Sequence, residues 1–288
     1  QDLTRVTGAN ISVRATDEFM NAVKRDEEYE QRWPVDATNP EVSNQFSAKE
    51  VWDALIGGAH ASAEPGVLFW DTATKMTPAD AYTDEGFGSV STNPCGEIIL
   101  SPYDSCRLML VNLTSFVDSP WKDDAIFDYG KFRVTVMKAQ RLMDDMIDLE
   151  IEQIDKILAK IDHDPESDEV KYYERNLWNK IKEVALKGRR TGLGITGLGD
   201  ALAMLGQTYG SDASIETTEE IYKWLSLASY EESIVLAKER GSFPIWDLKK
   251  EKEHPFINRI LGELLDYRIQ DYQTYGRRNI ANTTTAPA

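Results

Sequence analysis

The only two cysteines of the chain lie close together, beside other side chains that can do chemistry. Cys95 stands in a polar Asn93-Pro94-Cys95-Gly96-Glu97 turn, and Cys106 follows it. Cysteines are often buried as small apolar side chains, but a polar turn is a poor place to bury one. In an extended segment alternate residues project to the same side, so Asn93, Cys95 and Glu97 are expected to face one substrate. The pattern predicts a reactive thiol next to a carboxylate base and an amide.

This stretch resembles the active-site finger loop of the large, catalytic subunit of ribonucleotide reductase. The similarity covers residues 91–98 and continues through Cys106-Arg107-Leu108 and Asn112-Leu113. It is greatest to the adenosylcobalamin-dependent class II, because the di-iron class more often has a leucine where Pro94 stands. Four other segments resemble the family in the right order, namely residues 10–13, 16–20, 189–200 and 282–288.

The resemblance implies that ribonucleoside di- or triphosphates are reduced to 2′-deoxyribonucleotides for DNA synthesis by a thiyl-radical mechanism. Cys95 matches the thiyl position, and Glu97 matches the carboxylate that takes the proton of the 3′-hydroxyl. Asn93 matches the amide that holds the ribose hydroxyls. Cys106 matches one of the two thiols that donate electrons and end as a disulfide, with its partner expected on an upstream strand outside this chain.

The resemblance also implies a substrate-binding segment near the end of the chain. Thr283, Thr284, Thr285 and Ala286 match the start of a loop whose backbone amides and hydroxyls hold the substrate phosphates. Ser12 lies in a segment that is similar to the family and is a further substrate-binding candidate. Residues 4–10 loosely resemble the loop through which nucleotide effectors alter base choice.

The cofactor and partners follow from the same resemblance. Adenosylcobalamin is the implied cofactor, and the alternative is a radical from a separate di-metal small subunit. The implied partners are a ribonucleotide substrate, an allosteric nucleotide effector bound largely outside this chain, and a thioredoxin- or glutaredoxin-type reductant, with a homodimer as one possible assembly. No metal site is expected, because His60, His163 and His254 lack zinc-ligand spacing and are expected at the surface.

Three other interpretations remain open. The chain begins at Gln1 without a methionine and stops at Ala288 inside the apparent phosphate loop, so it could be an inactive piece of a split reductase that needs complementary chains. Whether it is such a piece or a partial gene product, the chain is expected to be a fragment from which an amino-terminal effector domain and a carboxy-terminal part are absent. A dithiol redox protein would instead need a Cys95–Cys106 disulfide. Residues 192–197 fit the dinucleotide pattern G-x-G-x-x-G, but they follow no convincing strand, which favours a packing role where a turn meets the next helix.

Composition restricts the class of protein. The chain has 49 acidic and 32 basic side chains and a net charge of −17, which argues against DNA binding because a nucleic-acid binder needs a basic face. The acid-rich stretches at residues 123–124 and 162–169 are expected to be solvated faces. No apolar run is long enough to span a membrane, and two cysteines without a disulfide framework fit a reducing cytoplasm.

Hydrophobic periodicity predicts an α/β architecture. Helices are expected at residues 17–25, 48–63, 129–161 and 217–240, the last ended by Gly241, and strands at residues 67–70 (buried) and 108–113. Residues 27–47 are expected to be loop, and a polar connection is expected between residues 70 and 91. The resemblance makes the whole chain, residues 1–288, a partial catalytic barrel domain: part of a ten-stranded α/β barrel with a central finger loop at about residues 91–106.

Overall fold

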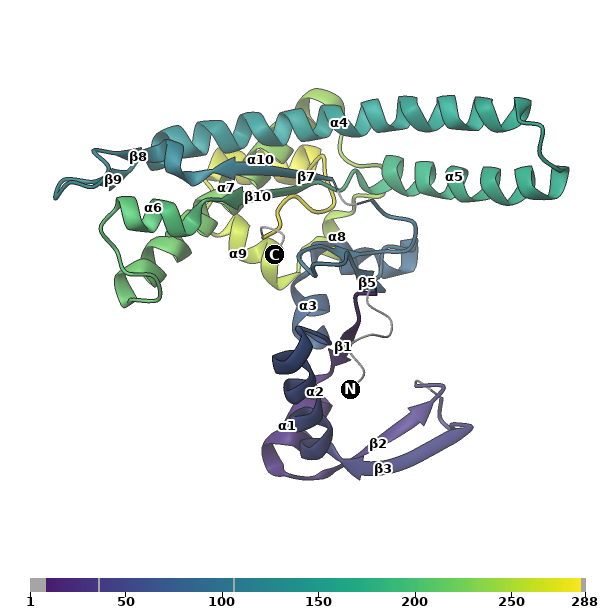
Figure 1. Ribbon diagram of the computed structural model, residues 1–288. Helices are drawn as coiled ribbons and strands as arrows, with labels where there is room; N and C mark the ends of the chain where they lie inside the picture. The colour runs from purple at the N-terminus through teal and green to yellow at the C-terminus, as the bar shows by residue number, and fades with distance from the viewer. Residues whose placement is uncertain (1–8, 36, 106, 286–288) are drawn as a thin grey trace. The chain divides into compact units, whose positions relative to one another are not determined.

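The computed structural model describes residues 9–35, 37–105 and 107–285, and the chain divides into two compact units. The N-terminal unit is Gln1–Met76, and the C-terminal unit is Thr77–Ala288. The elements of the N-terminal unit, labelled in Figure 1 except for β4, are β1 (Ser12–Ala15), α1 (Asp17–Arg25), β2 (Glu28–Trp33), β3 (Val42–Ser47), α2 (Ala48–Ser62), β4 (Gly66–Phe69) and α3 (Trp70–Met76).

The C-terminal unit holds the remaining elements. Its strands are β5 (Ser91–Thr92), β6 (Ile99–Leu100), β7 (Leu108–Asn112), β8 (Val117–Asp118), β9 (Ile126–Phe127) and β10 (Gly192–Thr196). Its α-helices are α4 (Tyr129–His163), α5 (Asp168–Gly188), α6 (Leu198–Met204), α7 (Asp212–Arg240), α8 (Leu248–Glu251), α9 (Pro255–Leu261) and α10 (Asp266–Tyr275), and its 3-10 helices are η1 (Pro78–Glu85) and η2 (Leu113–Phe116). None of the helices described in either unit is both long and apolar enough to cross a lipid bilayer.

Local capping fixes the helices of the N-terminal unit. The Thr16 hydroxyl accepts a hydrogen bond from the backbone amide of Phe19 at 3.1 Å, and acidic residues occupy the first turn of α1. Phe19 and Ala22 face inward and pack with Ala15 and Ala48 into a small core. The helices predicted at residues 17–25 and 48–63 are therefore confirmed, because their start signals are local.

The loop predicted for residues 27–47 is wrong, because this stretch forms the antiparallel hairpin β2–β3. Tyr29 pairs with Phe46 across the two strands, with ring centroids 5.8 Å apart, and Tyr29 also packs edge-on against Phe19. Pro34 lies outside the strands, in the connection between them. The prolines mark this turn and do not break the whole segment.

The strand predicted at residues 67–70 exists, but it differs in burial and extent. Strand β4 pairs in parallel with β1, its first three residues are half-buried, and Phe69 is 53% exposed. Trp70 begins α3 and is not part of the strand. The connection expected between residues 70 and 91 contains α3 and the 3-10 helix η1, whose Tyr82 is completely buried.

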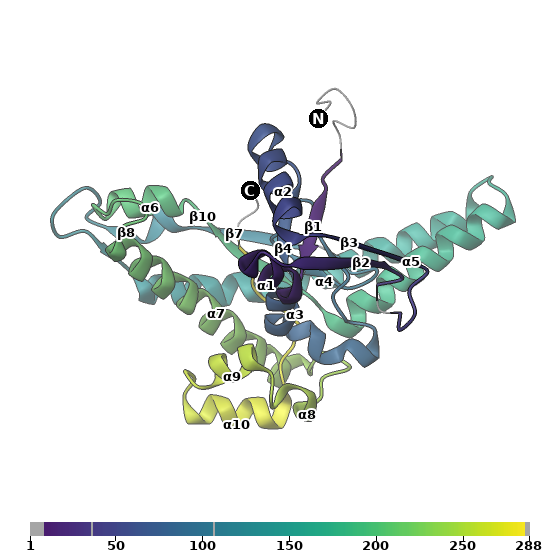
Figure 2. The same cartoon turned by 90° about the horizontal axis from the view of Figure 1, so that it is seen from below.

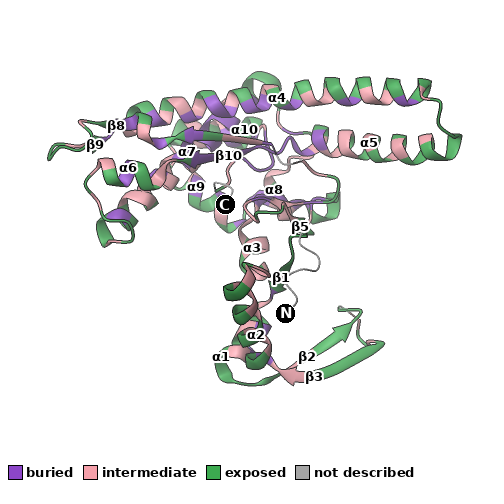
Figure 3. Ribbon diagram, viewed as in Figure 1, coloured by how far each residue is buried: buried purple, intermediate pink, exposed green. Residues whose placement is uncertain are grey.

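The core of the C-terminal unit lies between two long helices and a parallel strand pair. Figure 3 shows the buried residues concentrated in β10 and in the parts of α4 and α7 near it, whereas the distal ends of α4 and α5 are mostly exposed. Phe132, Val136 and Met143 form the buried stripe of α4 and join Leu225 of α7 in this core. Helices α9 and α10 pack against α7, as Figure 2 also shows. The predicted helices at residues 129–161 and 217–240 are confirmed, with α7 beginning earlier at Asp212.

Three further expectations concern a helix end, the histidines and an acid-rich stretch. Gly241 follows α7 with φ of +88°, a conformation that suits glycine, so the predicted stop is confirmed. His254 is buried, with Nε2 3.2 Å from the Thr77 carbonyl oxygen, so its expected surface position is wrong. Its burial also lowers the pKa of the imidazole. His60 and His163 are exposed, as are Asp123 and Asp124.

The glycine-rich segment contains a strand that sequence analysis missed. Residues Gly192–Thr196 form β10, which pairs in parallel with the predicted strand β7, and Leu193 also forms a bridge with Thr283. Gly197, with φ of +72°, is the N-cap residue before α6, and a Cβ added there would lie 2.8 Å from Oδ1 of Asn112, so the expected packing at the turn before the next helix is confirmed. The described strands form separate pairs, and a closed ten-stranded barrel is not seen among them.

Candidate active site

The Asn-Pro-Cys-Gly-Glu sequence occupies the tip of a small hairpin. Strands β5 and β6 pair through Ser91–Leu100 and Thr92–Ile99, and residues 93–98 connect them. The Asn93 amide donates to the Ile98 carbonyl oxygen at 3.1 Å, and the Ile98 amide donates to Oδ1 of Asn93 at 3.0 Å. The tip is therefore closed at its base by both the backbone and the side chain of Asn93.

The extended geometry expected for this tip is wrong. The Gly96 amide donates to the Asn93 carbonyl oxygen at 3.0 Å, which makes a turn with Pro94 at its second position. Gly96 has φ of +80°, which a residue with a side chain rarely adopts. Because the segment turns here, alternation along a strand does not decide where Cys95 and Glu97 point.

The hairpin is held against the strand pair by one apolar and several polar contacts. Ile98 is buried, and a Cβ added to Gly192 would lie 3.0 Å from its Cδ1 atom, so this close approach depends on glycine. The Ser101 hydroxyl donates to the Phe87 carbonyl oxygen at 2.7 Å. Arg190 lies two residues before β10, and its buried guanidinium group pairs with Asp104 and donates a hydrogen bond to the Ser101 hydroxyl. The base of the hairpin is thereby fixed relative to β10.

The segment that ends the described chain lies along the other edge of β10. The Leu193 amide donates to the Asn282 carbonyl oxygen at 2.8 Å, and the Thr284 amide donates to the Leu193 carbonyl oxygen at 3.0 Å. Thr283 forms the parallel bridge with Leu193. Strand β7, strand β10 and residues 281–284 therefore run side by side in the same direction, so their carboxyl ends meet at one edge.

The two regions predicted from sequence to carry the chemistry meet at this edge. The Thr284 hydroxyl donates to the backbone carbonyl oxygen of Glu97 at 2.6 Å. Both carboxylate oxygens of Glu97 are shielded from solvent, and neither has a hydrogen-bond partner among the described residues. Buried polar atoms are nearly always satisfied in folded proteins, so an unpaired carboxylate here indicates a place for a ligand that donates hydrogen bonds.

The other predicted site residues differ in exposure and in the unit that carries them. Cys95 is exposed at the hairpin tip, and Thr285 is exposed beyond the bridge. Asn93 is half-buried, and its Oδ1 accepts one hydrogen bond from the Ile98 amide, which leaves the second lone pair of this oxygen and the amide nitrogen for a ligand. Ser12 is an exposed residue of β1 in the N-terminal unit. Cys106, Ala286 and most of the expected effector loop at residues 4–10 lie outside the described residues.

A buried polar network that sequence analysis did not identify fixes the start of β10 and the segment before Thr283. Nε2 of Gln140 lies 3.1 Å from both the Thr191 hydroxyl and Oδ1 of Asn279, and the Ser233 hydroxyl reaches the same Asn279 oxygen at 3.0 Å. Nδ2 of Asn279 donates to Asp144 at 3.1 Å. These residues come from α4, α7 and two loops, so no single sequence pattern could have grouped them.

Two buried carboxylates complete this support, each neutralised by arginine. Burial alone would raise the pKa of Asp144, but the Arg189 guanidinium, whose Nε lies 2.8 Å away, and that of Arg278 hold the pKa below its usual value. Burial likewise opposes ionisation of Glu251, and Arg277, 2.6 Å away, lowers the pKa of that carboxyl. Arg277 and Arg278 immediately precede Asn279, so both ion pairs anchor the chain that leads to Thr284.

A cluster of carboxylates on α4 has the spacing of a cation site. Oxygens of Asp144, Asp145 and Asp148 lie within 4.8 Å of one another. Each is already paired with arginine, Asp144 and Asp145 with Arg240 and Asp148 with Arg189. These guanidinium groups supply the positive charge that a metal ion would otherwise bring.

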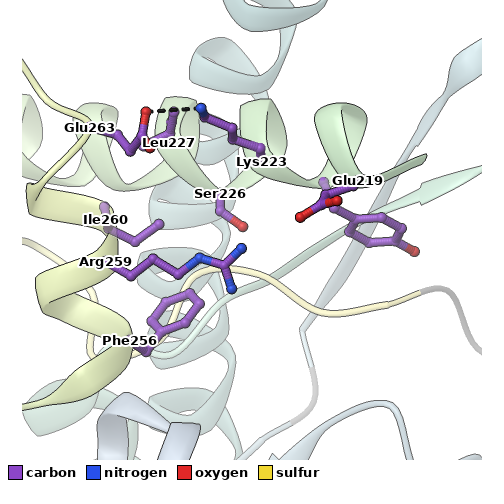
Figure 4. A pocket seen from close by; sticks show the side chains of 9 residues that line it. Glu219, Lys223, Ser226, Leu227, Phe256, Arg259, Ile260 and Glu263 are labelled. Carbon is purple, nitrogen blue, oxygen red and sulfur yellow. Dashed lines mark ion pairs between the residues drawn. The ribbon is translucent and has the colours of Figure 1, made fainter. Parts of the chain in front are cut away.

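Three cavities lined by described residues of the C-terminal unit have none of Asn93, Cys95 and Glu97 in their lining. The first, of about 350 Å³, lies between α7 and α9 and is shown in Figure 4. Its lining includes an ion pair between Lys223 and Glu263, 2.9 Å apart, and the side chain of Arg259. A second, of about 480 Å³, lies between α4 and α5 beside Tyr103, and a third, of about 440 Å³, lies between α6 and α7.

Comparison with known proteins identifies the family. A family model described as the ribonucleotide reductase barrel domain matches residues 1–288. The chain is 32% identical over 240 residues to the vitamin B12-dependent ribonucleoside-diphosphate reductase of Thermoplasma acidophilum, a match that covers 82% of this chain and 26% of that protein. A protein of the same name from Mycobacterium tuberculosis is 30% identical over 236 residues, which is 82% of this chain and 29% of that protein.

A third relative extends the match along nearly the whole chain. The vitamin B12-dependent ribonucleotide reductase of Rhodopirellula baltica is 27% identical over 304 aligned residues, covering 97% of this chain and 25% of that protein. The chain thus spans roughly a quarter of the length of these relatives. With the family model matched from end to end, the chain belongs to the ribonucleotide reductase barrel-domain family.

Proposed function

We propose that this chain is the central catalytic part of a vitamin B12-dependent ribonucleotide reductase that converts ribonucleoside di- or triphosphates to 2′-deoxyribonucleotides. The Glu97 carboxylate supports this most directly, because both of its oxygens are buried at the tip of the finger loop and have no hydrogen-bond partner in the part of the chain that the structure describes. A ribose hydroxyl is a hydrogen-bond donor that would satisfy such a carboxylate. The names of the relatives support the choice of a B12-dependent reductase.

The residues of the hairpin tip take distinct roles in this proposal. The Cys95 thiol, as a thiyl radical, removes the hydrogen from the 3′ carbon of the ribose, and its exposure leaves the sulfur accessible. Glu97 takes the proton of the 3′-hydroxyl, which requires a separation of roughly 2.6–3.2 Å. Asn93 offers its amide nitrogen as a donor to a ribose hydroxyl, and its oxygen, which accepts one hydrogen bond from the Ile98 amide, can accept a second.

The reduction needs two electrons and two protons, because the 2′-hydroxyl leaves as water and a hydrogen takes its place. Two thiols supply them and become a disulfide. Cys106 is proposed as one of these thiols and its partner lies outside this chain. A thioredoxin- or glutaredoxin-type protein would then reduce the disulfide, so that turnover can continue.

Adenosylcobalamin, when bound, would supply the first radical for Cys95. The exposed thiol at the end of a hairpin fits this role, because a cofactor has to approach the sulfur from outside the strand pair. A nucleotide effector and a homodimer belong to the same proposal for the whole reductase.

The proposal is tested in the full-length enzyme with adenosylcobalamin, dithiothreitol and each ribonucleotide. Cys95→Ser should abolish deoxyribonucleotide formation while nucleotide affinity is retained, because a serine oxygen cannot form an accessible radical. Cys106→Ser should still release tritium from 3′-labelled substrate but yield little product, because only the electron-donating step is lost.

A matched pair of variants tests the carboxylate. Glu97→Gln should lower kcat by about 100-fold or more, which is the scale of a lost general base. Glu183→Gln makes the same change in an exposed residue of α5 that pairs with Lys187, and it should leave kcat unchanged. Product formation by Cys95→Ser at the wild-type rate would refute the proposed function.

A further inference from the structure

Thr284 joins the segment that follows the buried arginine network to the tip of the finger loop. Its backbone amide is fixed by the Leu193 carbonyl oxygen at 3.0 Å, and its hydroxyl donates to the Glu97 carbonyl oxygen at 2.6 Å. The two residues are 187 positions apart in the sequence. This short hydrogen bond therefore fixes the position of the Glu97 backbone relative to the strand beside β10.

Packing fixes the direction of the Thr284 side chain. A Cβ built on Gly194 would lie 3.3 Å from the Thr284 methyl carbon, so the methyl group rests over the bare backbone of Gly194. Because the methyl and the hydroxyl share one carbon, a methyl held over β10 sets the direction of the hydroxyl. The threonine is therefore oriented before any substrate binds.

The hydroxyl used in this way is no longer available to a phosphate. A threonine hydroxyl has one hydrogen to donate, and a phosphate oxygen at neutral pH accepts hydrogen bonds. While the Thr284 hydrogen is directed to the Glu97 carbonyl oxygen, the side chain cannot donate to a substrate phosphate as well. This distinguishes Thr284 from Thr285, whose side chain lies at the exposed end of the segment.

We propose that Thr284 is a positioning residue for Glu97 and not a phosphate ligand. Its hydroxyl holds the Glu97 backbone so that the carboxylate stays buried at the place where a ribose hydroxyl would bind. The proposal rests on the proposed function for the role of Glu97, whereas the hydrogen bond itself is independent of that role. One short segment would thereby determine two positions, that of the substrate phosphates bound beyond Thr284 and that of the proton acceptor Glu97.

The test compares three substitutions in the full-length enzyme. Thr284→Val keeps the shape and removes the donor, and it should lower kcat by about 10- to 100-fold, because a displacement near 1 Å at a reacting group costs that much. Nucleotide Kd, from equilibrium binding, should stay within about threefold of wild type, since an interaction used only in the reaction changes kcat and not binding. Thr284→Ser keeps the hydroxyl donor, so its kcat should lie within about threefold of wild type. Thr135→Val is the control, because that hydroxyl also donates to a carbonyl oxygen, of Lys131 at 2.9 Å, but on α4.

A second measurement reads the hydrogen bond without catalysis. Thr284→Val should speed amide hydrogen exchange in the peptide covering residues 93–98, because the tip loses its tie to the strand, whereas Thr284→Ser should not. If wild-type enzyme were inactive, the proposed function would fail while this exchange measurement still tested the link.

Several results would overturn the role of Thr284. A raised Kd with unchanged kcat in Thr284→Val would make it a phosphate ligand. Loss of kcat in Thr284→Ser equal to that in Thr284→Val would show that the hydrogen-bond donor is not sufficient to position Glu97. Unchanged kcat and exchange in Thr284→Val would make the contact incidental. Should Thr284→Val fail to fold, Thr284→Ser decides alone, with kept activity in support and lost activity against.

Discussion

Gly194 offers the sharpest test of how the strands hold the site. This buried glycine lies in the middle of β10, between β7 and the segment that carries Thr284. An added Cβ would lie 2.9 Å from Cδ2 of Leu110, 3.1 Å from the Thr285 carbonyl oxygen and 3.3 Å from the Thr284 methyl carbon. Gly194→Ala therefore has to displace a backbone atom and not only a flexible side-chain end.

The expected cost follows from these distances. Leu110 can rotate away, but the Thr285 carbonyl group belongs to the chain that pairs with β10 and must move by a few tenths of an ångström. Overpacking of this kind costs about 1–3 kcal/mol. The backbone of Gly194 is ordinary for a strand, so the cost arises from space and not from a forbidden conformation.

The matched control is Gly199→Ala in α6. An added Cβ at Gly199 meets no atom within 4 Å, and alanine favours a helix over glycine by up to about 1 kcal/mol, so no loss of stability is expected.

Amide hydrogen exchange of the full-length enzyme measures the local effect. The backbone amides of Leu193 and Thr284 donate hydrogen bonds across this contact. Their amide hydrogens should therefore exchange about 5- to 150-fold faster in Gly194→Ala, the rate ratio that corresponds to about 1–3 kcal/mol. We also expect weaker nucleotide binding, because Thr285 moves. Exchange equal to that of Gly199→Ala would refute the inference that glycine is needed here for close strand approach.

The remaining predictions concern the buried ion pairs. Glu251→Gln should destabilise the enzyme locally by about 3–5 kcal/mol, because Arg277 is only 1% exposed and would be left without its counter-charge. Faster amide hydrogen exchange at residues 277–282 would support this prediction. Exchange at the wild-type rate would contradict it. In the folded chain Arg277 lowers the pKa of Glu251 below 4.5, against the effect of burial. This lowered pKa fixes the sign of the pH dependence of stability. The stability it contributes is complete above about pH 4.5 and is lost as pH falls through the lower folded pKa, so acid unfolding of wild type should steepen there and flatten in Glu251→Gln. A pH profile identical in the two proteins would show that another group controls acid stability.

The sequence alone determined those parts of the protein whose signals are local. The helix predicted at residues 17–25 has those bounds because Thr16 caps it and Asp26 ends it within a few residues. The strand after Cys106 was predicted from its short apolar run, and the long helix from Tyr129 was predicted from an apolar stripe with helical spacing. The family was also readable, because the residues around Cys95 and Glu97 form a contiguous motif.

Only the tertiary structure decided which distant segments meet. Strand β10 is rich in glycine and has weak strand propensity, and it is a strand because β7 and residues 281–284 satisfy its backbone on both edges. The hairpin β2–β3 likewise depends on Tyr29 and Phe46 pairing across its turn. The hydrogen bond from Thr284 to Glu97 spans 187 positions, so its partners become neighbours only when the parallel strands align them. Local sequence fixes conformation within a few residues, whereas the pairing of remote backbone groups is settled by burial and hydrogen bonding in the folded chain.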